Sequence, residues 1–210
     1  MTHKEHLKIV INNTFQSLSA TYSDQIEGGF NPCGATRLVI PRKSVQSGGA
    51  IRLSEQELRF VFVEELIKYL ATDQGKDWDV YYSVETPTAH NYSFPKSGPI
   101  HHGNKKEGRS GNIDLTIHDN TGRRVALIEF KHGHDEHAMN KDFLKLAKEP
   151  EVQLRYFIGL LSASTKSTKS RIENPKKESY IDSNNTILIY YSLAHNGAPG
   201  VVLGEQYIKE

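Results

Sequence analysis

The sequence predicts an α/β protein in which a mixed β-sheet is flanked by helices. Three features point to this fold class: residues 111–131 have the pattern of a β-hairpin, a capped amphipathic helix is expected over residues 54–71, and a second helix, residues 136–148, lies between two apolar strands. A helix that connects two strands of one sheet almost always makes a right-handed crossover between parallel strands. The sheet should therefore combine antiparallel and parallel pairs.

The hairpin is the element around which the other strands should assemble. In its first strand, Ile113, Leu115 and Ile117 alternate with polar residues, which is the period-two pattern of a half-buried strand. The Asp-Asn-Thr-Gly sequence at 119–122 suits a tight turn, because Asn and Gly tolerate a positive φ. The second strand, residues 124–131, is apolar on both faces and is therefore expected in the middle of the sheet.

The helix over residues 54–71 has the clearest start signal. Ser54 and Glu57 form a capping box, in which side chains satisfy the first free amides of a helix. The residues that share its apolar face are Leu58, Phe62, Leu66, Tyr69 and Leu70. Glu65 lies at the edge of this face, where an unpaired carboxylate is costly, so we expect it to meet a cation or to reach water. Glu64 is expected at the surface.

The remaining segments are assigned from periodicity and from turn residues. Before the hairpin we expect an amphipathic helix over residues 3–18, for which a strand stays an alternative, a loop over 23–36, a short strand over 36–40, a longer strand over 78–86 and a long loop over 87–110. After the hairpin we expect the helix over 136–148, a strand over 154–162, a basic loop over 164–179, a strand over 186–193 and a short edge segment over 201–208. The apolar residues on one face of the helix over 136–148 are Met139, Phe143, Leu146 and Ala147. We expect a single domain over residues 1–210, with its core over about 54–193 and a helical extension over 1–50.

Length and composition exclude several classes of protein. A chain of 210 residues is long enough for one sizeable α/β domain. Its 26 Lys and Arg residues nearly balance its 25 Asp and Glu residues, so a footprint for nucleic acid has to be local. A single cysteine, Cys33, excludes an internal disulfide and suits a reducing compartment. We find neither a signal peptide nor a run of membrane-spanning length, and we expect a cytoplasmic protein without membrane association.

Three residues of the hairpin indicate chemistry at one end of the sheet. Glu129 and Lys131 share one face of the second strand, and pairing across the hairpin brings Asp114 near Glu129. Two carboxylates that converge repel each other unless a hard divalent cation such as Mg²⁺ lies between them. Such an ion polarises a phosphoryl oxygen and acidifies a bound water, and a lysine beside it stabilises charge on a phosphate. The pattern therefore indicates metal-dependent hydrolysis of a phosphodiester.

The same residues resemble a known family. Asp114, fourteen intervening residues and then Glu129, Phe130 and Lys131 at the end of an apolar strand are similar to the motif of the PD-(D/E)xK nuclease superfamily. The expected order over residues 54–193, a glutamate-bearing helix, three strands, a helix and a further strand, is similar too. The resemblance implies a restriction-endonuclease-like fold. One position departs from the motif, because Ile113 stands where the family pattern has proline.

The resemblance also implies roles for individual residues. Asp114 and Glu129 would bind Mg²⁺ or Mn²⁺ together with the carbonyl group of Phe130. Lys131 would orient the attacking water or the phosphate. A helix glutamate, for which Glu65 is preferred, would complete the site. The further candidates are Glu64, Glu85 on the strand before the hairpin, and His132 directly after the motif.

The function that the resemblance implies is that of an endonuclease rather than an exonuclease, with DNA preferred over RNA, in restriction, repair or phage defence. Basic residues near the hairpin would contact the phosphate backbone. They are Lys105, Lys106 and Arg109 before it, Lys141 and Lys145 after it, and the lysines of the 164–179 loop. The sequence leaves open whether the protein forms a homo-oligomer or joins a larger complex.

Two other functions stay open. The first is a nucleic-acid-binding or assembly domain that keeps the fold without turnover. The second is a zinc protein, for which the donors would be His132, His134, Asp135 and His137, with His101 and His102 as further candidates. No cysteine or HExxH spacing accompanies these histidines, so their segment fits a strand-to-helix loop better than a zinc site.

Overall fold

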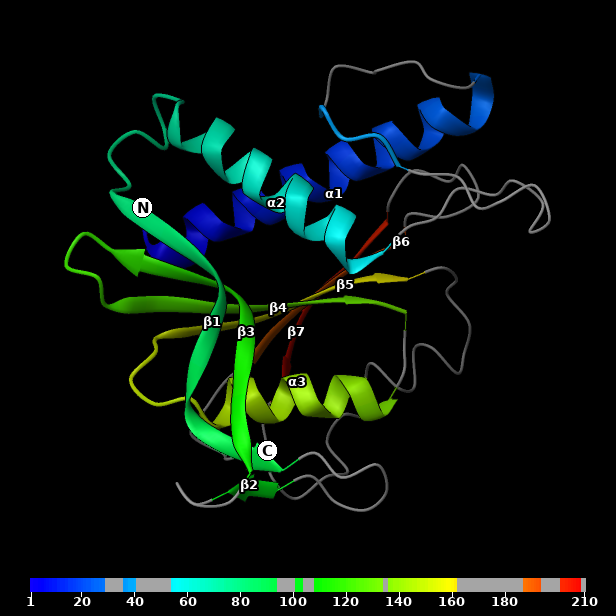
Figure 1. The fold of residues 1–210 in the computed structure, drawn as a ribbon. Coiled ribbons are helices and arrows are strands. Elements are labelled where there is room, and N and C mark those ends of the chain that lie inside the picture. Colours follow the sequence, from blue (N-terminus) through cyan, green and yellow to red (C-terminus); the bar gives the residue numbers. More distant parts are fainter. Residues whose placement is uncertain are drawn as a thin grey trace.

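The computed structural model describes residues 1–28, 36–40, 54–93, 101–103, 108–133, 136–161, 187–193 and 201–208. Its strands form one seven-stranded sheet in the order β2-β1-β3-β4-β5-β6-β7. Helices α1 (His3–Gly28) and α2 (Glu55–Leu70) lie on one face of the sheet, and α3 (Glu136–Lys148) lies on the other (Figure 1). The predicted α/β class, a mixed sheet flanked by helices, is confirmed.

The strands are β1 (Val80–Ser93), β2 (His101–Gly103), β3 (Arg109–Asp119), β4 (Arg124–His132), β5 (Leu154–Leu161), β6 (Ile187–Leu193) and β7 (Val201–Ile208). Pairing is antiparallel from β2 to β4, parallel from β4 to β6, and antiparallel again between β6 and β7. Helix α3 connects β4 to its parallel neighbour β5, which is the predicted crossover. Strand β4 lies between β3 and β5, and residues 125–130 are buried, as its two apolar faces predicted.

The hairpin between β3 and β4 has the predicted turn. The N–H of Asp119 donates to the carbonyl of Arg123, and the N–H of Gly122 donates to the carbonyl of Asp119, each at 2.9 Å. Gly122 has a φ of 82°, a left-handed conformation that glycine adopts without steric cost. The turn chemistry of residues 119–122 therefore sets the register of the two strands that carry the candidate site.

Helix α2 begins as predicted. Ser54 is its N-cap; the Ser54 hydroxyl accepts the N–H of Gln56 at 3.3 Å and also contacts the carboxylate of Glu57. A satisfied cap fixes the first turn of a helix. It therefore fixes where Glu55 and Arg59, which reach the candidate site, leave the helix.

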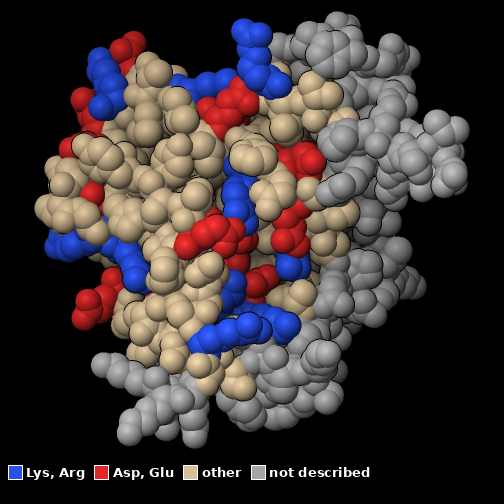
Figure 2. Space-filling model, viewed as in Figure 1, with Lys and Arg blue, Asp and Glu red and all other residues tan. Residues whose placement is uncertain are grey.

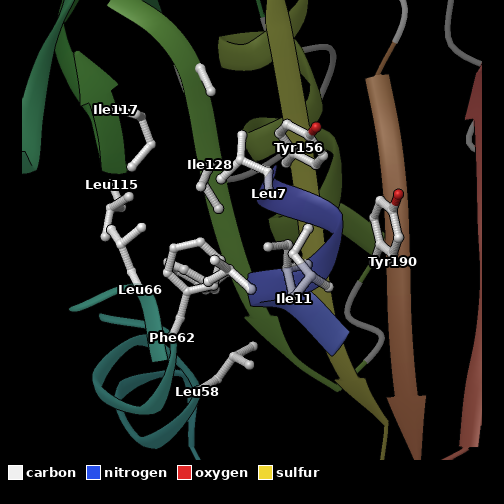
Figure 3. Close-up of a cluster of buried hydrophobic side chains, with 14 of the residues drawn as sticks. Leu7, Ile11, Leu58, Phe62, Leu66, Leu115, Ile117, Ile128, Tyr156 and Tyr190 are labelled. Carbon is white, nitrogen blue, oxygen red and sulfur yellow. The ribbon is translucent and has the colours of Figure 1, made fainter. Parts of the chain in front are cut away.

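Apolar side chains pack on both faces of the sheet. Figure 3 shows the larger cluster, in which Leu7 and Ile11 of α1 and Phe62 of α2 meet Ile128 of β4. On the other face, the apolar residues predicted for α3 are buried against β4, β5 and β6; they are Met139, Phe143, Leu146 and Ala147. Burial of each such Leu, Ile or Phe side chain stabilises the fold by roughly 1.5–3 kcal/mol. The two clusters hold α2 and α3 on opposite sides of β4.

The N-terminal third of the chain differs from the prediction in two places. Helix α1 continues to Gly28, through residues 23–28, which are expected to be a loop, because the segment before Gly28 contains no glycine or proline to end the helix. Residues 36–40 do not form a strand. The hydroxyl of Thr36 and the N–H of Arg37 both donate to Glu64, so these residues are bound to α2 instead of to the sheet.

The predicted loop over residues 87–110 is also wrong. Strand β1 continues through Pro87 to Ser93, and β2 and the start of β3 also lie in this range. Pro87 is tolerated because β2 pairs with residues 91–93 only, and the ladder with β3 shifts register between Pro87 and Asn91. Among the helices that the structure describes, none is both long and apolar enough to cross a membrane.

Candidate active site

The site begins where strands β3 and β4 separate. The ladder between them ends with the pair Leu115 and Ile128. Beyond this pair, β3 continues beside β1 and turns down past α3, whereas β4 continues beside β5 (Figure 1). Backbone groups lose a strand partner at such a point, and a buried N–H without an acceptor is costly. Side chains at the fork therefore have to supply the missing partners.

Asp114, the residue before Leu115, supplies one of them. Its Oδ2 accepts the main-chain N–H of Phe130 at 2.8 Å, and its Oδ1 lies 2.7 Å from Nη2 of Arg59 on α2. The Asp114 side chain is 16% exposed. Burial raises the pKa of Asp114, and the Phe130 amide and the Arg59 charge oppose this only in part. The carboxylate is thus fixed in place while its negative charge is incompletely balanced.

Glu129, the residue after Ile128, is the second carboxylate at the fork. It is 1% exposed, and its Oε1 lies 2.6 Å from Nζ of Lys145 on α3. Burial raises the pKa of Glu129 well above its ordinary value, repulsion from Asp142 and Asp114 adds to the rise, and Lys145 opposes it. Asp114 and Glu129 are therefore close enough to repel each other, as the hairpin register predicted.

Two lysines extend the site. Lys145 Nζ lies 3.1 Å from Asp142 and donates to the carbonyl of Asn112 at 2.9 Å. Lys131 Nζ lies 3.3 Å from Asp142 and 3.0 Å from Glu55, at the start of α2. Burial alone would lower the pKa of each lysine, but the neighbouring carboxylates outweigh it and raise both values. Both amines are therefore positively charged at neutral pH.

Arg59 joins the fork to strand β1. Its Nη1 lies 2.6 Å from Oε1 of Glu85, so the guanidinium bridges Glu85 and Asp114. Glu85 has a φ of 49°, in the left-handed region that non-glycine residues rarely occupy. This conformation lies between the regular pairs of Val84 with Leu115 and Thr86 with Ile113. An irregular residue in β1 thus carries the carboxylate that meets Arg59.

These groups form two sets of ion pairs, one around Arg59 and one around Lys131 and Lys145, and Asp114 of the first set and Glu129 of the second influence each other electrostatically. We call the two sets together the charged cluster. Its members are Glu55, Arg59, Glu85, Asp114, Glu129, Lys131, Asp142 and Lys145. Five carboxylates share three cations, so the formal charge is −2 when every group is ionised. Figure 2 shows acidic and basic side chains gathered in a band on this side of the molecule. Oxygen donors with an excess of negative charge fit a divalent cation such as Mg²⁺.

The carboxylates of the charged cluster are held apart by their own counter-ions. Arg59 contacts Asp114, whereas Lys145 contacts Glu129. In the part of the chain that the structure describes, no three His, Cys, Asp or Glu side chains are gathered as a metal site would require. An ion at this fork would therefore have to compete with these internal cations.

Comparisons with protein-family models, with curated proteins and with solved structures found no match for this chain. They identify no family, so the resemblance to the PD-(D/E)xK superfamily stays a prediction from the sequence.

The helix glutamate that reaches the charged cluster is neither of the two named from the sequence. Glu65 accepts a hydrogen bond from Ser17 of α1 at 3.0 Å and lies 2.8 Å from Lys68. Glu64 binds residues 36 and 37. Glu55, in the first turn of α2, is the glutamate that contacts Lys131. The physical reason is the direction in which each side chain leaves α2, because Glu64 points toward residues 36 and 37 and Glu65 points toward Ser17.

Three further candidates lie at or near the fork. Phe130 gives its N–H to Asp114 and packs its ring against Phe62, with ring centroids 5.3 Å apart. Glu85 joins the charged cluster through Arg59. The main-chain N–H of His132 lies 3.5 Å from Glu55 at the end of β4.

The basic residues predicted to contact nucleic acid are placed differently from one another. Arg109 is exposed at the start of β3, and Lys141 is half-buried on α3. Lys145 is 11% exposed and is bound to Glu129, so a contact to phosphate stays a prediction for this residue. Lys105 and Lys106 lie outside the described residues, as do the lysines of the 164–179 loop.

The zinc prediction falls largely on residues that the structure does not describe. His134 and Asp135 lie outside the described residues, and so do the side chains of the remaining histidines except His132; these are His101, His102 and His137.

Sequence reasoning did not identify Arg59, Asp142 and Glu55 as members of the site. A signal was present for Asp142, because it is three residues before Lys145, so the two share one face of α3. Asp142 and Lys145 lie beside the apolar face of α3 that packs on the sheet, and this position indicates that their partners are on the sheet. Arg59 and Glu55 had no comparable signal, because only the packing of α2 over the fork brings them to β3 and β4.

Proposed function

We propose that this protein is a metal-dependent phosphodiester hydrolase that acts on nucleic acid, with DNA as the preferred substrate and Mg²⁺ or Mn²⁺ as the cofactor. One observation carries the proposal: Asp114 and Glu129 lie directly beyond the last pair of the β3–β4 ladder and repel each other, with the amines of Lys145 and Lys131 in the charged cluster. Carboxylates, a compensating cation and nearby ammonium groups are the parts that phosphodiester hydrolysis requires.

The finer form of the proposal is a PD-(D/E)xK-type endonuclease with a restriction-endonuclease-like core. The succession α2, β1, β3, β4, α3, β5 supports it, with the short β2 as an addition at the edge. The motif residues lie on the two strands at which the family resemblance expects them. A role in restriction, repair or defence is part of the same proposal, as is a cytoplasmic location.

Each residue of the charged cluster has a role that follows from its contacts. Asp114 and Glu129 would hold the ion, which supplies Lewis-acid activation of the phosphodiester and of the attacking water. Lys145 places positive charge beside Glu129, and Lys131, which contacts Glu55 and Asp142, adds a second positive charge; both would stabilise negative charge that develops on a phosphate. Asp142 contacts both amines and keeps them in position. The N–H of Phe130 fixes the direction of the Asp114 carboxylate.

A second candidate is a nucleic-acid-binding or assembly domain without turnover. The observation that favours it is that Arg59 and Lys145 already occupy the two carboxylates. In such a protein the charged cluster would stabilise the fork between β3 and β4, and no ion would be needed.

Cleavage assays on supercoiled plasmid, linear duplex DNA and single-stranded RNA separate the two candidates. We expect metal-dependent cleavage by the wild-type protein and by Asp73→Asn, which changes a fully exposed carboxylate. We expect cleavage to fall at least about 100-fold in Asp114→Asn and Glu129→Gln, and to stop when EDTA is present. Nucleic-acid binding without cleavage in any metal would favour the second candidate. Stoichiometric zinc in the purified protein would instead favour a histidine metal centre.

A further inference from the structure

We propose that Arg59 is an internal counter-ion that a divalent cation displaces from Asp114, and that the released guanidinium then binds a phosphate of the substrate. The proposal rests on the proposed metal-dependent function and adds a residue that the hairpin motif does not contain. In this proposal, binding of the ion to Asp114 frees the Arg59 guanidinium, and the freed guanidinium helps to bind the substrate.

The geometry of Arg59 matches the position of a cation site. Its guanidinium bridges carboxylates from two neighbouring strands, at 2.7 Å from Asp114 on β3 and at 2.6 Å from Glu85 on β1. The Arg59 side chain is 11% exposed, so the charge is balanced by these carboxylates more than by water. A divalent ion with oxygen ligands carries twice the charge into the same place. Asp114 therefore cannot serve both cations equally, and its stronger electrostatic attraction to the double charge favours the divalent ion.

The backbone of Glu85 supports an exchange at this position. Its φ of 49° is costly for a residue with a Cβ, and such conformations persist mainly at functional sites. The Glu85 side chain is 51% exposed while it contacts Arg59. The bridge is therefore buried at Asp114 and open to solvent at Glu85. An ion can approach from the Glu85 side, and the guanidinium can move out toward solvent on the same side.

The guanidinium is also incompletely satisfied where it lies. Its Nε is buried and has no hydrogen-bond partner among the residues that the structure describes. A guanidinium has five N–H donors in a planar fork, and this fork matches the oxygens of a phosphate in pairs. Arg59 thus has donors to spare beside the carboxylate that would hold the ion.

Lys145, the other internal cation, is held more firmly. Its amine contacts Glu129 and Asp142 and donates to the carbonyl of Asn112. The three partners leave no donor of the ammonium group unused. Of the two cations on the fork, Arg59 is therefore the one that an incoming ion can replace.

The direct test is a titration of metal-free protein with Mn²⁺ alone, followed by calorimetry. We expect Arg59→Met to bind Mn²⁺ at least about tenfold more tightly than the wild-type protein, because the competing charge is gone. The matched control is Arg123→Met, which removes an arginine of the turn that pairs with Asp119, at the end of β3, and is 80% exposed. This control should bind Mn²⁺ as the wild-type protein does.

The outcomes separate this proposal from the proposed function. Equal or weaker binding by Arg59→Met than by the wild-type protein overturns the role of Arg59 and leaves the metal-dependent function standing. A failure of both proteins to bind Mn²⁺ overturns the proposed function together with this inference. Tighter binding by Arg59→Met supports both.

A measurement on the wild-type protein covers the case in which Arg59→Met does not fold. The Nε–Hε signal of Arg59 in a ¹⁵N NMR spectrum, assigned by its loss in Arg59→Lys, should shift during a Mg²⁺ titration and saturate with the binding curve. The signal of Arg123 should stay in place. An Arg59 signal that does not respond while Mg²⁺ binds overturns the exchange.

Discussion

The carboxylate of Asp114 accepts the N–H of Phe130 at 2.8 Å, on the strand that carries the other two residues of the motif. A side chain of β3 thus takes the place of a strand partner for β4 at the point where the two strands part. The same bond that satisfies the backbone also aims the carboxylate at the candidate site. Structure and proposed chemistry therefore depend on one contact, and substitutions can separate them.

Substitutions of Asp114 should separate stability from activity. In Asp114→Asn the amide oxygen still accepts the N–H of Phe130, whereas in Asp114→Ala this N–H loses its acceptor. We expect the Ala variant to be less stable than the Asn variant by about 1–3 kcal/mol, the cost of a buried unsatisfied group. Both variants should lose at least about 100-fold in cleavage. Urea denaturation and a plasmid cleavage assay measure the two effects, and equal stabilities would show that the bond to Phe130 carries no weight.

Lys145 should matter more for stability than its place on a surface helix would suggest. In Lys145→Met, the buried carboxylate of Glu129 loses its ion pair, and removal of one partner of a buried pair costs about 3–5 kcal/mol. Lys148→Met on the same helix should change the free energy of unfolding by less than about 0.5 kcal/mol. Similar losses in the two variants, measured by chemical denaturation, would contradict the contact between Lys145 and Glu129.

Local patterns predicted most of the fold. The strand over residues 111–117, the turn at 119–122 and the apolar face of residues 139–147 each depend on neighbours in sequence, and each is confirmed. The path of β1 through Pro87 could not be predicted in this way. It depends on which sides of β1 are paired, and that is decided by residues far along the chain.

In the candidate site, too, the local sequence predicted the residues of the hairpin but not those that the helices contribute. The spacing of Asp114 and Glu129 on a hairpin was enough to predict that they would be neighbours. Arg59 and Glu55 come from α2, and Asp142 comes from α3, so their arrival depends on how each helix packs on the sheet. Periodicity gives the face of a helix but not the strand residue that this face meets.

The charge on Glu129 should make the stability of the protein depend on pH. Burial raises the pKa of Glu129, so the folded protein binds this proton more tightly than the unfolded chain does. The contribution to stability is complete below the ordinary value of 4.5 and is lost as the pH rises through the folded pKa. We therefore expect the stability of Glu129→Gln relative to the wild-type protein to rise between about pH 5 and about pH 8.

Thermal unfolding of Glu129→Gln and wild-type protein in metal-free buffer over this range measures the effect. Asp73→Asn, which changes an exposed carboxylate, is the control and should show no pH-dependent difference. A stability difference between Glu129→Gln and wild type that is the same at every pH would contradict the raised pKa that we assign to the buried carboxylate.

The parallel part of the sheet depends on the absence of a side chain at Gly159. A Cβ at this position would lie 2.4 Å from the ring of Tyr191, its partner on β6. We expect Gly159→Ala to lower the free energy of unfolding by about 1–3 kcal/mol. Tyr191→Leu in the same chain should recover part of the loss, because it removes the ring. Additive losses in the double-mutant cycle would show that the two residues do not meet.

The most direct test of the central claim is the location of an ion in a crystal of the wild-type protein soaked in Mn²⁺. Our account predicts an anomalous difference peak at the fork of β3 and β4, bound by Asp114 and Glu129, with Arg59 moved away from Asp114. A protein that stays without a peak at the fork at saturating Mn²⁺, with Arg59 and Lys145 still on these two carboxylates, would contradict it.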